Sequence, residues 1–193
     1  MRNLIIAAGT TLAISAAANA GITDTQLTID ITGEESWDFF GDVDNTVLSF
    51  DLAAALGRPS GSPVIVTSIG WNVKIQTQGA SWLSEATVAL ADSMGTYGLF
   101  VSPGAGNDAP GTGTFSSGGL IDLTDAGIPN IKLDDGILLM ELAEGYDDVD
   151  GAIDAIYQAI SQGQGSEIYI GVPTPGTAAI LGVATIAGIR RRR

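Results

Sequence analysis

Residues 69–76 have the sequence IGWNVKIQ, in which apolar side chains alternate with small or polar ones. Successive side chains of a β-strand point to opposite faces, so every second residue of this stretch shares one face. The apolar face consists of Ile69, Trp71, Val73 and Ile75. The stretch therefore predicts a central strand with one face in a hydrophobic core.

The same two-residue period recurs on both sides of this stretch. Further strands are predicted over residues 27–31, 46–52, 64–66, 82–90, 98–101, 120–123, 137–142 and 168–172. Turn-forming sequences rich in Gly, Pro, Ser and Asp separate several of them, at residues 58–63, 135–136 and 162–165. Many short strands at this spacing indicate an all-β fold, an antiparallel β-sandwich or jelly roll.

Three segments depart from the two-residue period. Residues 51–56 contain three consecutive alanines, which favour a helical turn. Ile153, Ile156, Tyr157 and Ile160 stand at helical spacing, which predicts a short helix over residues 150–161. Residues 103–119 are rich in Gly, Pro, Ser and Thr, and we expect a long surface loop there.

The composition excludes several classes of protein. The 193 residues include no Cys and no His, so disulfides, thiolate zinc sites, Cys nucleophiles and Ser-His-Asp triads are excluded. The net charge of −14 argues against nucleic acid as a partner. Residues 21–171 hold all 22 acidic residues against three basic ones, which leaves −19. Such a surface attracts divalent cations, or it serves solubility alone.

The N-terminus resembles a secretory signal peptide. Arg2 provides a positive start, and residues 4–18 are uncharged and largely apolar. Ala18-Asn19-Ala20 is an A-x-A cleavage site, which predicts a signal helix over residues 1–20 and a mature chain that begins at Gly21.

The C-terminus has three parts. Residues 172–177 have the sequence VPTPGT, an apolar stretch continues to Ile189, and the chain ends in Arg190, Arg191, Arg192 and Arg193. As a helix, residues 172–189 would be about 27 Å long, close to the ~30 Å hydrocarbon core of a bilayer. Clustered arginines remain in the cytoplasm. Residues 172–193 therefore predict a transmembrane helix that holds an external domain.

Val172, Pro173, Thr174 and Pro175, followed by this helix and the arginines, resemble the bacterial PEP-CTERM sorting signal in its V-P-T-P variant. The resemblance implies recognition and cutting near the proline motif by exosortase, a membrane transpeptidase-like enzyme. It also implies a precursor anchored in the inner membrane and a product at the cell surface or in an exopolysaccharide matrix. The alternative is an ordinary C-terminal membrane anchor, and both interpretations predict export.

The body shows a second resemblance. Ser36-Trp37, Gly41-Asp42 with Asn45, and residues 81–88 are similar to the jelly-roll P domain of proprotein convertases. Calcium sites and a stabilising role are what this resemblance implies.

Two acidic clusters are candidate calcium ligands, because Ca²⁺ takes six to eight oxygen ligands. The clusters consist of Asp42 and Asp44, and of Asp147, Asp148, Asp150 and Asp154. Asp148 and Asp150 with Gly151 imitate part of an EF-hand loop, but Tyr146 and Tyr157 would occupy its first and twelfth positions. Asp is also a favoured turn former, so solvated turns are the alternative.

No catalytic residues are predicted, since no His is available to activate a Ser or Thr hydroxyl. We expect residues 21–171 to form a non-enzymatic acidic domain. A calcium-dependent carbohydrate-binding module that takes extracellular polysaccharide is the first alternative, with Phe39 and Phe40 beside Trp37 as either an exposed platform or core residues. A carboxylate-based glycan hydrolase is the second, because paired carboxylates supply a general acid and base.

Overall fold

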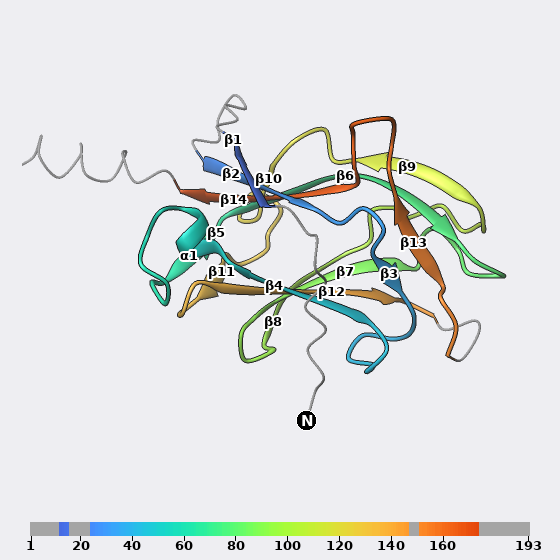
Figure 1. Ribbon diagram of the computed structural model, residues 1–193, viewed down its shortest axis with the longest axis horizontal. Helices are drawn as coiled ribbons and strands as arrows, with labels where there is room; N and C mark the ends of the chain where they lie inside the picture. Colours follow the sequence, from blue (N-terminus) through green and yellow to red (C-terminus); the bar gives the residue numbers. More distant parts are fainter. Residues whose placement is uncertain (1–11, 16–23, 147–150, 174–193) are drawn as a thin grey trace, which may run out of the picture.

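The computed structural model describes residues 12–15, 24–146 and 151–173, and its strands form two facing layers (Figure 1). The upper layer in that view is an eight-stranded sheet, and the lower layer is a four-stranded sheet. The pairings between strands are antiparallel. The all-β, antiparallel sandwich architecture is therefore confirmed.

The eight-stranded sheet has the order β1-β2-β14-β6-β13-β3, and β9 and β10 pair with the other edge of β6. Its strands are β1 (Leu12–Ser15), β2 (Asp24–Asp30), β3 (Glu35–Ser36), β6 (Ser68–Thr77), β9 (Thr112–Ser116), β10 (Ile121–Asp122), β13 (Ala155–Gln158) and β14 (Glu167–Pro173). The ten-residue strand β6 is the spine of this sheet, because its first half pairs with β14 and its second half pairs with β13.

The four-stranded sheet has the order β4-β12-β7-β8. Its strands are β4 (Thr46–Asp51), β7 (Ala86–Asp92), β8 (Tyr97–Val101) and β12 (Ile137–Glu144). A separate pair joins β5 (Val64–Val66) to β11 (Ile131–Leu133). The short helix α1 (Leu52–Ala55) confirms the helical turn predicted after β4, and the Asp51 carboxylate caps it by accepting a 2.8 Å hydrogen bond from the Ala54 N–H.

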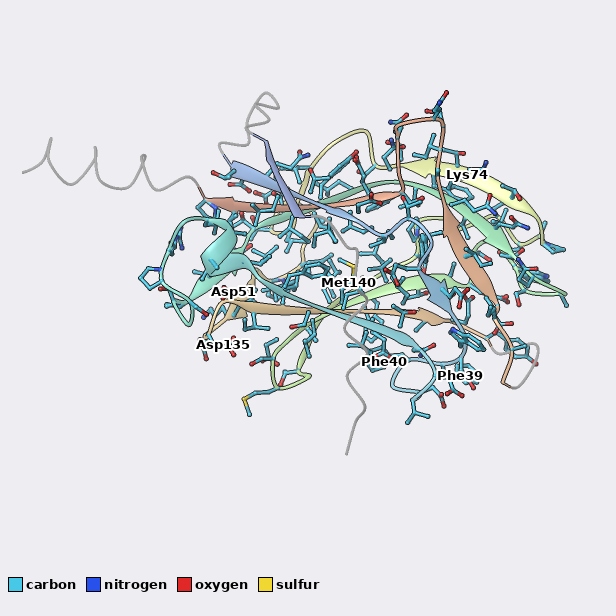
Figure 2. All side chains as sticks on the ribbon, in the orientation of Figure 1. Phe39, Phe40, Asp51, Lys74, Asp135 and Met140 are labelled. Carbon is cyan, nitrogen blue, oxygen red and sulfur yellow. The ribbon has the colours of Figure 1, made fainter. Side chains whose placement is uncertain are left out.

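The core lies between the two sheets. Val73 and Ile75 of β6 are fully buried, and Trp71 on the same face is half-buried and packs against the core. Opposite them, Leu138, Met140 and Leu142 of β12 are fully buried. Met140 lies between the layers in Figure 2. The two-residue period in residues 69–76 therefore assigns the correct face to β6.

The helix predicted over residues 150–161 is wrong, because Ala155–Gln158 form β13. Ala155 and Tyr157 are fully buried, whereas Ile156 and Gln158 are half-buried, which is strand alternation. This segment forms a strand because pairing with the free edge of β6 satisfies its backbone hydrogen bonds.

Two further expectations fail for related reasons. The loop predicted over residues 103–119 contains β9, which pairs with the other edge of β6. The strand predicted over residues 82–90 begins only at Ala86, and Trp82 lies in the preceding turn with 43% of its surface exposed. Trp82 is therefore a surface residue rather than a core residue.

The start of β2 lies beside the end of β14. In β14, Val172 pairs with Thr25 and Pro173 with Asp24. The domain therefore extends two residues beyond its predicted end at residue 171. Val172 and Pro173 belong to this strand and not to the helix expected over residues 172–189. Buried Val172 continues the inward face of Ile168 and Ile170, which holds the strand in register.

At the N-terminus, residues 12–15 form β1 on the edge of β2, where a signal helix is predicted. The edge of β2 offers unpaired backbone groups that these residues satisfy. The described residues contain no helix long and apolar enough to cross a bilayer. Other predicted sorting residues lie outside the described chain: Thr174, Pro175, Arg190, Arg191, Arg192 and Arg193.

Candidate binding groove at the β3–β4 loop

Residues 37–45, which connect β3 to β4, form a loop organised by one buried amide. Asn45 is 3% exposed, and its Oδ1 accepts hydrogen bonds from the backbone N–H groups of Trp37 (3.2 Å) and Asp38 (3.0 Å). Its Nδ2 donates to the Phe39 carbonyl at 2.8 Å and to Glu141 Oε1 at 3.1 Å. Both ends of the amide are thus occupied, and the two ends of the loop are held together.

The loop is also fixed to the lower sheet. Glu141 of β12 is 6% exposed, and its Oε1 accepts a 2.5 Å hydrogen bond from the Gly41 N–H. The rings of Phe40 and Phe100 of β8 meet edge to face, with centroids 5.1 Å apart. The Glu144 N–H donates to the Asp38 carbonyl at 2.8 Å. Figure 2 shows Phe39 and Phe40 at the end of the lower layer opposite Asp51 and Asp135.

A groove of about 340 Å³ opens between this loop and the strands beside it. This volume lies at the lower end of the range found for small-molecule sites. The residues that line the groove are Glu34, Glu35, Trp37, Val43, Asp44, Asn45 and Thr46. Trp37 is half-buried, and Val43 stands at 79% exposure. The groove thus combines an aromatic ring with three carboxylates and has no basic residue in its lining.

The predicted calcium ligands are placed differently from one another. Asp42 Oδ1 accepts a 2.9 Å hydrogen bond from the Asp44 N–H, so Asp42 stabilises a turn, which is the alternative to calcium binding. Asp44 lines the groove. Asp154 is 1% exposed, and its Oδ1 accepts a 2.8 Å hydrogen bond from the Ser81 hydroxyl. Asp154 therefore lies in the interior, whereas Asp44 is exposed at the surface.

The remaining predicted ligands, Asp147, Asp148 and Asp150, lie outside the described residues. Within the described part of the chain, no three acidic side chains gather into a group that could hold a metal. Calcium binding stays a prediction.

A buried polar cluster adjoins the loop. The Ser36 hydroxyl donates to Glu144 Oε1, and Glu144 is 3% exposed. Tyr157 is fully buried, and both this burial and the nearby Glu144 raise the pKa of its phenol far above the ordinary value. Burial disfavours the charged phenolate, and a neighbouring carboxylate repels it.

Neither Glu141 nor Glu144 was predicted from the sequence as a functional residue. Glu144 continues the inward series of Leu138, Met140 and Leu142, so an acidic residue at a core position was the available signal. Glu141 lies on the other face of β12, and only the fold shows that the loop covers it. Phe39 is 51% exposed, whereas the Phe40 ring packs on Phe100, so the first ring is a surface residue and the second is a packing residue.

Neither a protein-family model nor a curated protein sequence matches this chain. Among solved structures, the chain is similar to one from infectious bursal disease virus (Gt strain), with 11% sequence identity and a TM-score of 0.34. The match covers 87% of this chain and 38% of the viral chain. The chain thus spans little more than a third of the length of that protein, and a similarity this low carries no argument about function.

Proposed function

We propose that this chain is an exported, non-enzymatic protein of the cell surface or extracellular matrix, sorted through a PEP-CTERM-like signal at residues 172–193. The observation that carries the proposal is the order of the proline motif, the apolar stretch and the four terminal arginines. An exosortase-type enzyme is the proposed processing partner, and the apolar stretch is the proposed membrane contact of the precursor.

The geometry of the domain supports this route. The start of β2 and the end of β14 are paired, with Asp24 opposite Pro173. A signal segment before Asp24 and a membrane helix after Pro173 would therefore start side by side, so both could reach one membrane without unfolding the domain. Residues 12–15, which form β1 on the edge of β2, would be removed with the signal segment by cleavage before Gly21. The jelly-roll, P-domain-like form of the sandwich belongs to the same proposal, as a stabilising module.

The test is mass spectrometry of the protein from a bacterium that encodes an exosortase-type enzyme. We expect an N-terminus at Gly21 and loss of the C-terminal arginines. The matched variant replaces Arg190, Arg191, Arg192 and Arg193 with Gln, and a second variant replaces Pro173 and Pro175 with Ala. Recovery of matrix protein that still carries Arg193, or normal processing of both variants, would contradict the proposal.

Carbohydrate binding is a second candidate function, favoured by the groove beside Trp37. Aromatic rings bind the apolar faces of sugars, and carboxylates accept hydrogen bonds from hydroxyl groups. Calcium dependence would rest on the Asp-rich segment that ends at Asp154. Glu34, Glu35 and Asp44 line the same groove and could supply a general acid and base. Incubation of the protein with oligosaccharides, followed by analysis for shortened products, tests whether it is a hydrolase.

A further inference from the structure

We propose that β1 reserves the edge of β2 for a second copy of this chain: once residues 1–20 are removed, the β2 strands of two copies pair with each other in the register that β1 had. This inference rests on the proposed export route, because cleavage before Gly21 is the step that removes β1. It does not depend on the groove beside the β3–β4 loop.

β1 is the outermost strand of the eight-stranded sheet, where it covers the edge of β2 (Figure 1). The two strands are antiparallel, with Leu12 opposite Ile29 and Ser15 opposite Gln26. When residues 12–15 are absent, the backbone N–H and C=O groups that point outward from β2 lose their partners. An uncovered edge of this kind is a template for another strand.

Nothing within β2 blocks its edge. The strand is seven residues long, contains no Pro, Lys or Arg, and pairs with β14 without a register shift. Prolines, basic side chains and bulges are the features with which proteins usually protect an edge. Strand β8, at an edge of the lower sheet, has such a feature, because its pairing with β7 contains a register shift.

β2 itself repeats the sequence pattern of β1, which identifies the occupant. Residues 12–15 have the sequence LAIS, and residues 27–30 have the sequence LTID. In β1, the leucine lies opposite Ile29 and the isoleucine lies opposite Leu27. A twofold axis at Thr28 reproduces this arrangement, because it places the partner's Leu27 opposite Ile29 and the partner's Ile29 opposite Leu27. A second copy therefore presents the same apolar residue types to β2 as β1 does.

The polar residues of β2 are compatible with the same axis. Gln26 would lie opposite the partner's Asp30, so that an amide donor faces a carboxylate acceptor. The other charged residue of the strand, Asp24, is already engaged, because its Oδ2 accepts hydrogen bonds from the hydroxyls of Thr67 (2.6 Å) and Ser68 (2.7 Å). The axis places no two carboxylates of the paired strands directly opposite each other, an arrangement that would oppose pairing.

In the precursor, β1 excludes the second copy. Residues 16–23 join β1 covalently to β2, and a short tether gives a strand an effective concentration on the order of 1 mM. A second copy at micromolar concentration competes poorly against it. Cleavage before Gly21 removes the competitor, so the dimer forms only after export.

The test is disulfide cross-linking, which is specific here because the chain contains no Cys. In the proposed dimer the two residues at position 28 lie opposite each other, with Cα atoms about 4.5–5.5 Å apart, a separation that a disulfide spans. The Thr28→Cys chain is expressed for export, purified in mild detergent and oxidised. The register control is Gln26→Cys, because the two residues at position 26 would be about 13 Å apart along the strands. We expect at least about tenfold more disulfide-linked dimer from Thr28→Cys than from the control, at equal melting temperatures.

Two further chains separate cleavage from pairing. The first combines Thr28→Cys with Ala18→Leu and Ala20→Leu, which remove the small residues of the cleavage site. Because β1 then stays on its tether, we expect at least about tenfold less dimer. The second chain adds Leu12→Asp and Ile14→Asp, which place carboxylates opposite buried apolar residues of β2. Cross-linking should return in this chain although its cleavage site is blocked. Mass spectrometry reports the N-terminus of every chain.

Each contrary outcome refutes a different statement. Equal cross-linking of Thr28→Cys and Gln26→Cys, or none in either, would overturn the pairing of β2 with a second copy. Equal cross-linking of the processed and the cleavage-blocked chains would overturn the role of β1. If the exported Thr28→Cys chain keeps residues 1–20, the export route is contradicted instead. The chain with Leu12→Asp and Ile14→Asp then decides the pairing by itself, and its failure to cross-link would overturn it.

Discussion

Replacement of Tyr157 by Phe should stabilise this protein. The Tyr157 ring lies in the core, its surface is fully buried, and among the described residues no group is hydrogen-bonded to its hydroxyl. A buried polar group without a partner costs about 1–3 kcal/mol. Removing one oxygen leaves a small void, which costs a few tenths of a kcal/mol at about 24 cal/mol per Å³. The net expectation is a gain of about 1–2 kcal/mol in the free energy of unfolding.

The assay is urea unfolding followed by tryptophan fluorescence, with thermal melting as a second measurement. A gain of that size corresponds to a rise of about 2–8 °C in the melting temperature of a domain this long. The control is Tyr169→Phe, because the Tyr169 hydroxyl donates a 3.0 Å hydrogen bond to Glu167 Oε2. That half-exposed bond should contribute about 0.5 kcal/mol, so its removal should destabilise slightly.

Opposite signs for the two Tyr→Phe variants are therefore expected. A loss of 1 kcal/mol or more in Tyr157→Phe would refute the reasoning, because it would show that the phenol makes a stabilising hydrogen bond in the core. In that case the acceptor to test first would be Glu144, the carboxylate that helps to raise the pKa of the Tyr157 phenol.

Three further predictions follow from the same structure. Burial and then the Glu167 hydrogen bond raise the pKa of Tyr169 from 10.0 to about 12, so the stability it contributes is present below pH 10 and lost as the pH rises toward 12; alkaline melts of Tyr169→Phe should fall less steeply over that window. The Ala54 N–H lowers the pKa of Asp51 below 3.8, so its contribution should be present above that pH and lost below it, and acid unfolding of Asp51→Asn should show a weaker pH dependence. A Cβ at position 70 would collide with the Gly119 carbonyl oxygen, so Gly70→Ala should cost about 1–3 kcal/mol in urea melts, and an unchanged midpoint would contradict the close approach.

The sequence by itself determined the face assignment of the central strand β6. The alternation in residues 69–76 identified Val73 and Ile75 as inward-facing, because a two-residue period is a local property. It also determined the acidic surface and the composition of both termini. These features do not depend on which segments are neighbours in the folded protein.

The tertiary structure decided which segments became strands where the local pattern was ambiguous. Residues 153–160 fit a helical period as well as a strand period, and pairing with β6 selected the strand. Residues 112–116 carry almost no apolar signal, yet the opposite edge of β6 supplies their backbone partners. The sequence of a short segment therefore does not reveal which strand it will pair with, and that pairing decides its secondary structure.

The groove was likewise beyond the sequence. Trp37 and Asp44 were both visible as candidates, but their union in one cavity depends on Asn45 reaching Glu141, 96 residues away. Nothing in a local window links an amide in a loop to a carboxylate on the outer face of a distant strand. Residue types and periods are encoded locally, whereas a site is created by contacts between segments that only the folded chain brings together.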